Sequence, residues 1–87
     1  MKVLANSFLD MNQPERAIKY FDQLIYHEPG NDDYLLKRGI CKYKLDKPDE
    51  AMADWRKCIA LNPSNKSVSS YISNILNEQN DRKNAKK

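Results

Sequence analysis

The chain repeats itself at a spacing of 34 residues, and this period constrains its fold more than any other feature of the sequence. Five positions recur unchanged in both copies: Pro14 and Pro48, Ala17 and Ala51, Ile25 and Ile59, Pro29 and Pro63, and Asn31 and Asn65. A fixed period between about 20 and 50 residues is typical of arrays of small stacked units. Because each unit buries one face against its neighbours, such an array leaves an extended surface for a partner. The period therefore favours binding over catalysis.

Several segments carry apolar residues at helical spacing, and none alternates apolar and polar residues as a strand does. We expect helices over residues 1–11, from Pro14 to Pro29-Gly30, from about Tyr34 to Leu45, from Pro48 to Asn62, and from Asn65 to about Leu76. Proline fits the first turn of a helix, where its missing backbone N–H is no loss. The pattern predicts an all-α chain of two helical hairpins and one single helix.

Length and composition are those of one small globular domain. The chain has 87 residues, of which 40% are hydrophobic and 31% charged, and this length is near the lower limit for a self-sufficient core. No apolar run approaches the roughly 18 residues of a membrane span. Polar residues interrupt the N-terminus too early for a secretory signal. Cys41 and Cys58 are expected to be free and buried, so a cytoplasmic location is favoured.

The net charge of +3 resides at the C-terminal end of the chain. Residues 1–80 hold 11 basic and 11 acidic side chains, whereas residues 81–87 hold four basic side chains and one acidic side chain. We expect a basic, polar tail over residues 79–87 that is disordered, as chain ends often are. Its basic residues have no aromatic side chain among them, and binding of single-stranded nucleic acid relies on such stacking platforms. We therefore expect no nucleic acid partner and no membrane insertion.

The residues at fixed positions of the two copies resemble the tetratricopeptide repeat (TPR), a helix–turn–helix unit of 34 residues. The second copy offers Leu35-x2-Arg38-Gly39-x2-Lys42, Ala51-x3-Trp55 and Pro63, and the first offers Met1-x2-Leu4-Ala5-x2-Phe8, Ala17-x3-Phe21 and Pro29. Small residues at these positions let two helices approach closely, and the aromatic residues fill the space between hairpins. The prolines end one repeat and redirect the chain. Arg38 replaces a leucine of the family pattern and Lys42 a tyrosine, without breaking the period.

The resemblance implies a right-handed superhelical array of antiparallel helix hairpins, a TPR-like solenoid of five helices. We expect a domain over residues 1–78, made of a first repeat (1–31), a second repeat (32–65) and a capping helix (66–78). Its structural landmarks are Ala5, Phe8, Ala17, Phe21, Pro29, Gly39, Ala51, Trp55 and Pro63. Such arrays usually need about three repeats for stability. We therefore expect a piece of a larger TPR protein or an array completed by self-association.

In this family the first helix of each hairpin lines a concave groove that holds a peptide or a helix of a partner protein. The resemblance places in this groove Lys2, Asn6, Leu9, Leu36, Lys37, Ile40, Tyr43, Lys44, Ser70, Tyr71 and Asn74. Alternatively, Leu36 and Ile40 cover a neighbouring helix, and the polar residues are ordinary surface. Tyr43 and Tyr71 are the better anchors, because tyrosine is enriched at binding hot spots.

The resemblance thus implies a protein–protein interaction module, and the residues argue against an enzyme. His27 is the only histidine, and no serine or cysteine has a recognisable base partner. Two glycines do not make a Gly-rich phosphate loop. We expect no cofactor and no metal. The alternative is a scaffold that self-assembles through exposed helix faces, in which Val3, Leu9 and Met11 are uncovered.

A third hypothesis is the carboxylate clamp of some co-chaperones in this family, which grips an acidic C-terminus. Lys2 and Asn6 fit the first pair of clamp residues, but Lys37 replaces the next asparagine. Ser67 and Tyr71 replace a lysine and an arginine, which removes two charge-assisted hydrogen bonds. The full clamp is therefore disfavoured, whereas a looser groove for acidic peptides on Lys2, Lys37 and Lys44 remains open.

Overall fold

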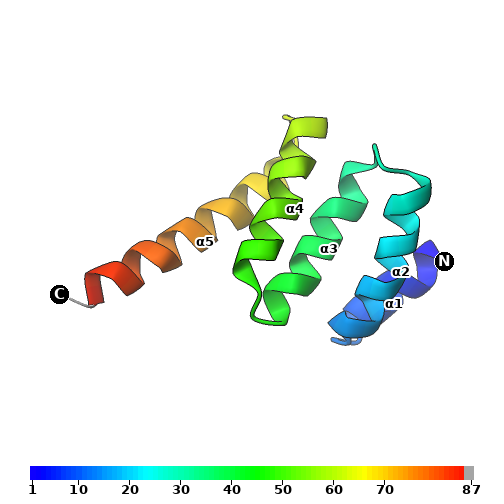
Figure 1. Cartoon of the computed structure of the whole chain (residues 1–87), viewed down its shortest axis with the longest axis horizontal. Helices are drawn as coiled ribbons and strands as arrows, with labels where there is room; N and C mark the ends of the chain where they lie inside the picture. Colours follow the sequence, from blue (N-terminus) through cyan, green and yellow to red (C-terminus); the bar gives the residue numbers. More distant parts are fainter. Residues whose placement is uncertain (86–87) are drawn as a thin grey trace.

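The structure, a computed structural model, describes the backbone of residues 1–85 and the side chains of residues 1–78. Residues 1–85 form five helices and no strand: α1 (Lys2–Asp10), α2 (Pro14–His27), α3 (Asp32–Lys44), α4 (Pro48–Leu61) and α5 (Lys66–Ala85). The body measures 46 × 27 × 17 Å, with the two termini at opposite ends (Figure 1). The predicted all-α array of helix hairpins is confirmed.

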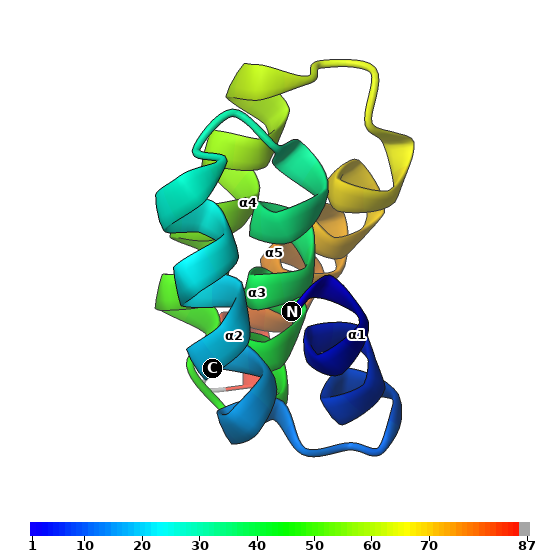
Figure 2. The same cartoon turned by 90° about the vertical axis from the view of Figure 1, so that its right-hand side faces the viewer.

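The helices form two layers. In Figure 2, α2 and α4 lie along one side of the molecule, and α1 and the first turns of α5 lie along the other, next to α3. The first helix of each hairpin therefore shares one face with the single helix α5. The predicted groove residues all belong to these three helices.

Each hairpin closes through the same tight turn. Asn12 and Asp46 are 34 positions apart and have positive φ angles of 58° and 61°. Asparagine and aspartate tolerate this left-handed conformation better than other residues with side chains. Pro14 and Pro48 follow two residues later and occupy the first turns of α2 and α4.

The links between repeats use asparagine caps. Asn31 Oδ1 accepts a hydrogen bond from the Asp33 backbone N–H at 3.1 Å, which satisfies one of the unpaired donors at the start of α3. Asn65 Oδ1 accepts in the same way from the Val68 backbone N–H at 3.2 Å, at the start of α5. Asn31 and Asn65, which are equivalent in the repeat, therefore each cap the helix that follows.

The first core cluster joins α2 to its two neighbours. Phe21 is fully buried together with Ala5 of α1, Ala17 of α2 and Cys41 of α3, and Tyr34 of α3, 5% exposed, belongs to the same cluster. Because both alanines are fully buried, they leave room for the helices to approach each other at the position of the ring. Phe21 therefore lies between the first hairpin and the second, as predicted.

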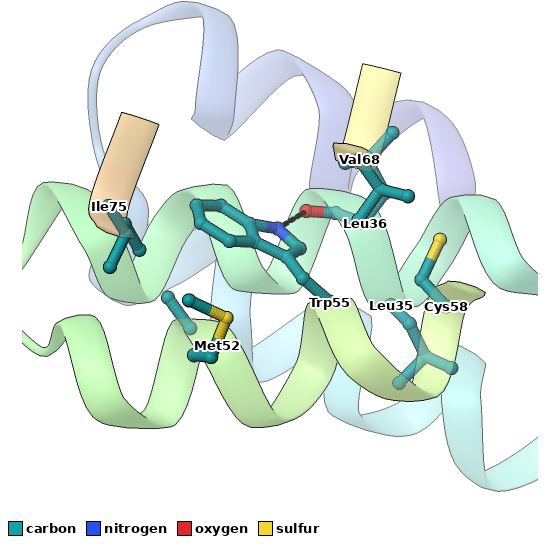
Figure 3. Packing of buried hydrophobic residues seen from close by; sticks show 8 residues of the cluster. Leu35, Leu36, Met52, Trp55, Cys58, Val68 and Ile75 are labelled. Carbon is teal, nitrogen blue, oxygen red and sulfur yellow. Dashed lines mark hydrogen bonds between the residues drawn. The ribbon is translucent and has the colours of Figure 1, made fainter. Parts of the chain in front are cut away.

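The second core cluster repeats this arrangement around Trp55 of α4, which is fully buried. Val68 and Ile75 of α5 pack against the indole (Figure 3). The indole Nε1 donates a hydrogen bond to the Leu36 carbonyl of α3 at 3.0 Å. Gly39 of α3 lies against the same ring, since a Cβ atom at this position would overlap Nε1 of the indole.

The remaining landmarks lie in the core or at the turns between repeats. Ala51 is fully buried, whereas Phe8 is half-buried and stacks on Tyr20, with ring centroids 5.6 Å apart. Pro29 and Pro63 lie two residues beyond the ends of α2 and α4, where the chain turns into the next helix.

The last helix is longer than the sequence indicates. Its backbone continues to Ala85, whereas the capping helix was expected to end at residue 78. The apolar periodicity stops near Leu76, but the helix itself continues beyond it. The side chains of 79–87 lie outside the described residues, and the nature of this basic segment in solution stays a prediction.

Candidate functional site

The predicted groove residues stand on α1, α3 and α5, and their exposure differs. Four are exposed: Lys2, Lys44, Ser70 and Asn74. Six are half-buried: Asn6, Leu9, Lys37, Ile40, Tyr43 and Tyr71. Only Leu36 is buried. Ten of the eleven therefore have surface to offer a ligand.

A polar contact joins α1 to α3 on this face. Lys37 Nζ donates a hydrogen bond to Asn6 Oδ1 at 2.9 Å and lies 3.4 Å from a carboxylate oxygen of Asp33. Asn6 and Lys37, which are 31 residues apart in sequence, are thus brought together. An ammonium group has three donors, so these two contacts leave a donor of Lys37 for a ligand.

The two predicted anchor tyrosines pack against Trp55. Tyr71 of α5 stacks on the indole at a centroid distance of 5.1 Å, and the Tyr43 ring of α3 lies 6.0 Å from it. The Tyr43 hydroxyl also donates a hydrogen bond to Glu78 Oε1 at 2.5 Å. Both tyrosines therefore help to hold α5 on the body of the chain, and as half-buried rings they offer a partner only part of their surface.

Leu36 and Ile40 differ in what they can contribute. Leu36 is only 8% exposed and belongs to the Trp55 cluster. Ile40 packs against the same cluster but stays half-buried. Leu36 is therefore a core residue, as the alternative interpretation has it, whereas Ile40 retains some apolar surface on this face.

An ion cluster around buried Asp54, between α2, α3 and α4, is not predicted by the sequence analysis. Arg38 holds both carboxylate oxygens of Asp54, at 2.9 and 2.7 Å, and reaches Asp22 at 2.9 Å. Lys42 lies 3.3 Å from Asp54, which is only 4% exposed. The hydrogen bonds to Asp54 raise the pKa of the Arg38 guanidinium. Arg38 and Lys42, the two departures from the family pattern, therefore both pair with Asp54 on the facing helix. The presence of this acidic residue on α4 is the sequence feature that could have indicated the cluster.

A second polar contact fixes the start of α3. Asp32 accepts hydrogen bonds from Asn65 Nδ2 at 3.0 Å and Asn62 Nδ2 at 3.1 Å. These amides, the Asn65 amide most strongly, lower the pKa of the Asp32 carboxyl group. The contact ties the second repeat to the turn that precedes α5. Like the ion cluster, it holds neighbouring helices together.

Cysteine and metal chemistry have little support within the described residues. Cys41 and Cys58 are free and buried, as predicted, and burial raises the pKa of each thiol to about 11. No group of three or more histidine, cysteine, aspartate or glutamate residues is placed to hold a metal ion in the part of the chain that the structure describes. Over the same part, no helix combines the length and the apolar character that crossing a bilayer requires.

The fold and its surface define a class of protein, namely arrays of antiparallel helix hairpins that present a shared face. Family models of the tetratricopeptide repeat match residues 4–31 and residues 32–65. The chain therefore belongs to the tetratricopeptide repeat family. Repeats of this family are protein–protein interaction modules, so the chain is such a module.

Three curated relatives share the name FK506-binding protein-like. The chain is 29% identical to those from Homo sapiens and Rattus norvegicus and 27% identical to the one from Mus musculus, in each case over 73 residues. The matched segment is 84% of this chain but only 21% of each relative. The chain thus spans about a fifth of the length of these relatives.

Proposed function

We propose that the face shared by α1, α3 and α5 binds an extended peptide or a helix of another polypeptide, without catalysis. The observation that carries this proposal is the Asn6–Lys37 contact at 2.9 Å. It aligns polar side chains of two successive repeats along one surface. Half-buried Ile40 and Tyr71 add apolar area beside it, and a mixture of apolar area and polar contacts is typical of protein interfaces.

Charge favours a ligand that carries acidic side chains. Lys2, Lys37 and Lys44 stand on this face, and Lys2 and Lys44 are exposed. A carboxylate gains a charge-assisted hydrogen bond from each lysine it reaches. The full carboxylate clamp is not part of the proposal, because Tyr71, at the position of the clamp arginine, is stacked on Trp55.

We further propose that the chain serves as a module of a larger protein. Its curated relatives extend far beyond the 21% of their length that it matches. Two repeats and one helix also provide only a short shared face, which suits a short peptide segment better than a large partner surface.

The test is a comparison of two doubly charge-reversed variants. Lys2→Glu/Lys44→Glu changes two exposed residues of the shared face, and Lys19→Glu/Lys57→Glu changes two exposed residues of α2 and α4. Proteins captured by the immobilised wild-type chain are identified, and their affinities are measured for each variant. We expect the affinity of the first variant for these proteins to fall roughly tenfold or more, which is about 1.4 kcal/mol of binding free energy. The second variant should bind them normally. Equal binding by both variants would show that the shared face is not the site.

A second candidate function, self-association, has support from α1. Four large apolar side chains at this end are exposed: Met1 (50%), Val3 (76%), Leu4 (48%) and Met11 (56%). Uncovered apolar residues in this number are typical of interaction surfaces. Light scattering at tens of micromolar tests this candidate. A dimer that reverts to a monomer on Val3→Lys supports it, and a monomeric wild-type chain contradicts it.

A further inference from the structure

A hollow of about 250 Å³ lies between α4 and α5, apart from the shared face. It is lined by Asp49, Met52, Ala53 and Arg56 of α4 and by Leu76 of α5. Leu76 is 50% exposed, although it is a large apolar residue. None of the five lining residues belongs to the proposed groove.

The internal repeat shows which position α5 occupies. Val68 and Ile75 of α5 are buried, and so are Tyr34 and Cys41 of α3, which precede them by 34 residues. Equivalent positions of α3 and α5 are thus buried in the core. Helix α5 therefore packs beside α4 in the way that α3 packs beside α2. It therefore corresponds to the first helix of a third hairpin.

On each of the two complete hairpins, at least one residue at the positions equivalent to Ile72 and Leu76 contacts the second helix of the hairpin. In α3 these positions are Arg38 and Lys42, and they pair with Asp54 and Glu50 of α4, Lys42 lying 3.9 Å from Glu50.

In α1 the equivalent positions are Leu4 and Phe8. Phe8 stacks on Tyr20 of α2 at 5.6 Å, and the Arg16 guanidinium lies 5.9 Å from the centre of its ring. The apolar pair of α5 thus resembles that of α1, of which Phe8 contacts α2 and Leu4 stays 48% exposed, and not the cationic pair of α3.

Over the described residues, the chain does not fold back over the hollow. After α1 and α3 the chain reverses at Asn12 and Asp46. The equivalent residue, Asn80, lies within α5, whose backbone stays helical to Ala85. Over the described residues, α5 therefore runs straight past the point at which each earlier hairpin closes, as Figure 1 shows.

We propose that the hollow binds an amphipathic helix of another polypeptide, in the position that α2 takes beside α1. Bulky apolar side chains of that helix contact Leu76 and Met52. Asp49 and Arg56 stand at the two ends of the α4 side of the hollow, so the helix carries a basic residue near Asp49 and an acidic residue near Arg56. The surface is independent of the groove proposed above.

The chain itself provides a matched pair of probes. One is a synthetic peptide of residues 13–28, which contains α2, the helix that contacts apolar Phe8 of α1. The other is a peptide of residues 47–62, which contains α4 and would place Asp54 and Glu50 against apolar Ile72 and Leu76. A buried carboxylate without a partner opposes binding. We therefore expect the first peptide to bind at least tenfold more tightly than the second.

Binding is measured on the full chain by NMR titration of backbone amides. We expect the largest shifts at Met52, Ala53 and Leu76, and an at least tenfold loss of affinity on Leu76→Lys. Leu61→Lys, which changes a residue 47% exposed at the end of α4, is expected to bind like the wild type. Circular dichroism establishes that both variants fold.

Four results would overturn this proposal: no shifts at 1 mM peptide, shifts confined to α1, equal affinity for the two peptides, or normal binding by Leu76→Lys. Lys2→Glu/Lys44→Glu is expected to bind the α2 peptide normally. Failure at the hollow and failure at the shared face are therefore distinguished by separate variants.

Discussion

Gly39→Ala is expected to destabilise the chain, because its new methyl group would collide with the buried Trp55 indole. The Cβ atom would overlap Nε1 and would lie 2.5 Å from Cδ1 and 2.9 Å from Cε2. Contacts below 3.0 Å do not persist, so either the ring or α3 must move. The ring is fully buried and hydrogen-bonded to Leu36, which leaves it little room to do so.

Opposing effects set the size of the loss. Overpacking of a core costs about 1–3 kcal/mol, and weakening the indole hydrogen bond adds about 1 kcal/mol. The higher helix propensity of alanine relative to glycine stabilises the variant by about 1 kcal/mol. The net loss is therefore about 1–3 kcal/mol, which lowers Tm by roughly 5–20 °C in a domain of this size. Urea and thermal unfolding followed by far-UV circular dichroism measure both quantities.

The first hairpin provides the control, since Ala5 and Phe21 stand at the positions of Gly39 and Trp55. A phenyl ring beside an alanine is thus already accommodated once in this chain. We expect Gly39→Ala/Trp55→Phe to lose at least about 1 kcal/mol less than the sum of the single variants. An unchanged or higher Tm for Gly39→Ala, or strict additivity of the two changes, would refute the reasoning.

Three further predictions follow from the polar contacts and the thiols. Arg38→Leu leaves buried Asp54 with Lys42 as its remaining ion partner; we expect a loss of about 3 kcal/mol in urea unfolding, and a smaller loss when Asp54→Leu is added. Asparagine side chains lower the pKa of Asp32, so its contribution to stability is present above its ordinary pKa of about 4 and disappears as the pH falls through the lowered value. The difference in Tm between Asp32→Ala and the wild type should therefore shrink on acidification; a difference that does not change with pH would contradict this. The thiols, with pKa values of about 11, should resist alkylation at pH 8 until urea unfolds the chain; rapid labelling of the folded protein would show that they are accessible.

The sequence predicts most of the fold because the two copies carry the same chemistry at the same positions. Phe21 and Trp55 occupy equivalent sites between hairpins, and both are fully buried. Proline at the start of α2 and α4 and an asparagine cap at Asn31 set helix boundaries that local rules anticipate.

Other features depend on contacts between distant residues, which one sequence does not reveal. Arg38 meets Asp54 only after α3 and α4 have packed together. The tyrosines of the expected groove, Tyr43 and Tyr71, lie against Trp55, because side chains from several helices together bury the large indole. The sequence does not predict the last turns of α5, because a polar helix outside the core carries no apolar periodicity.

The central claim is that the face shared by α1, α3 and α5 holds another polypeptide, and site-specific photo-crosslinking tests it most directly. A photoreactive amino acid is placed at exposed Ser70 on that face, at Leu76 in the hollow, or at exposed Lys57 of α4. Mass spectrometry then identifies the polypeptides joined at each position. We predict a reproducible crosslinked polypeptide at Ser70 that is absent at Lys57, and whose yield falls in Lys2→Glu/Lys44→Glu. Crosslinks at Lys57 alone, or none at Ser70, would contradict the account.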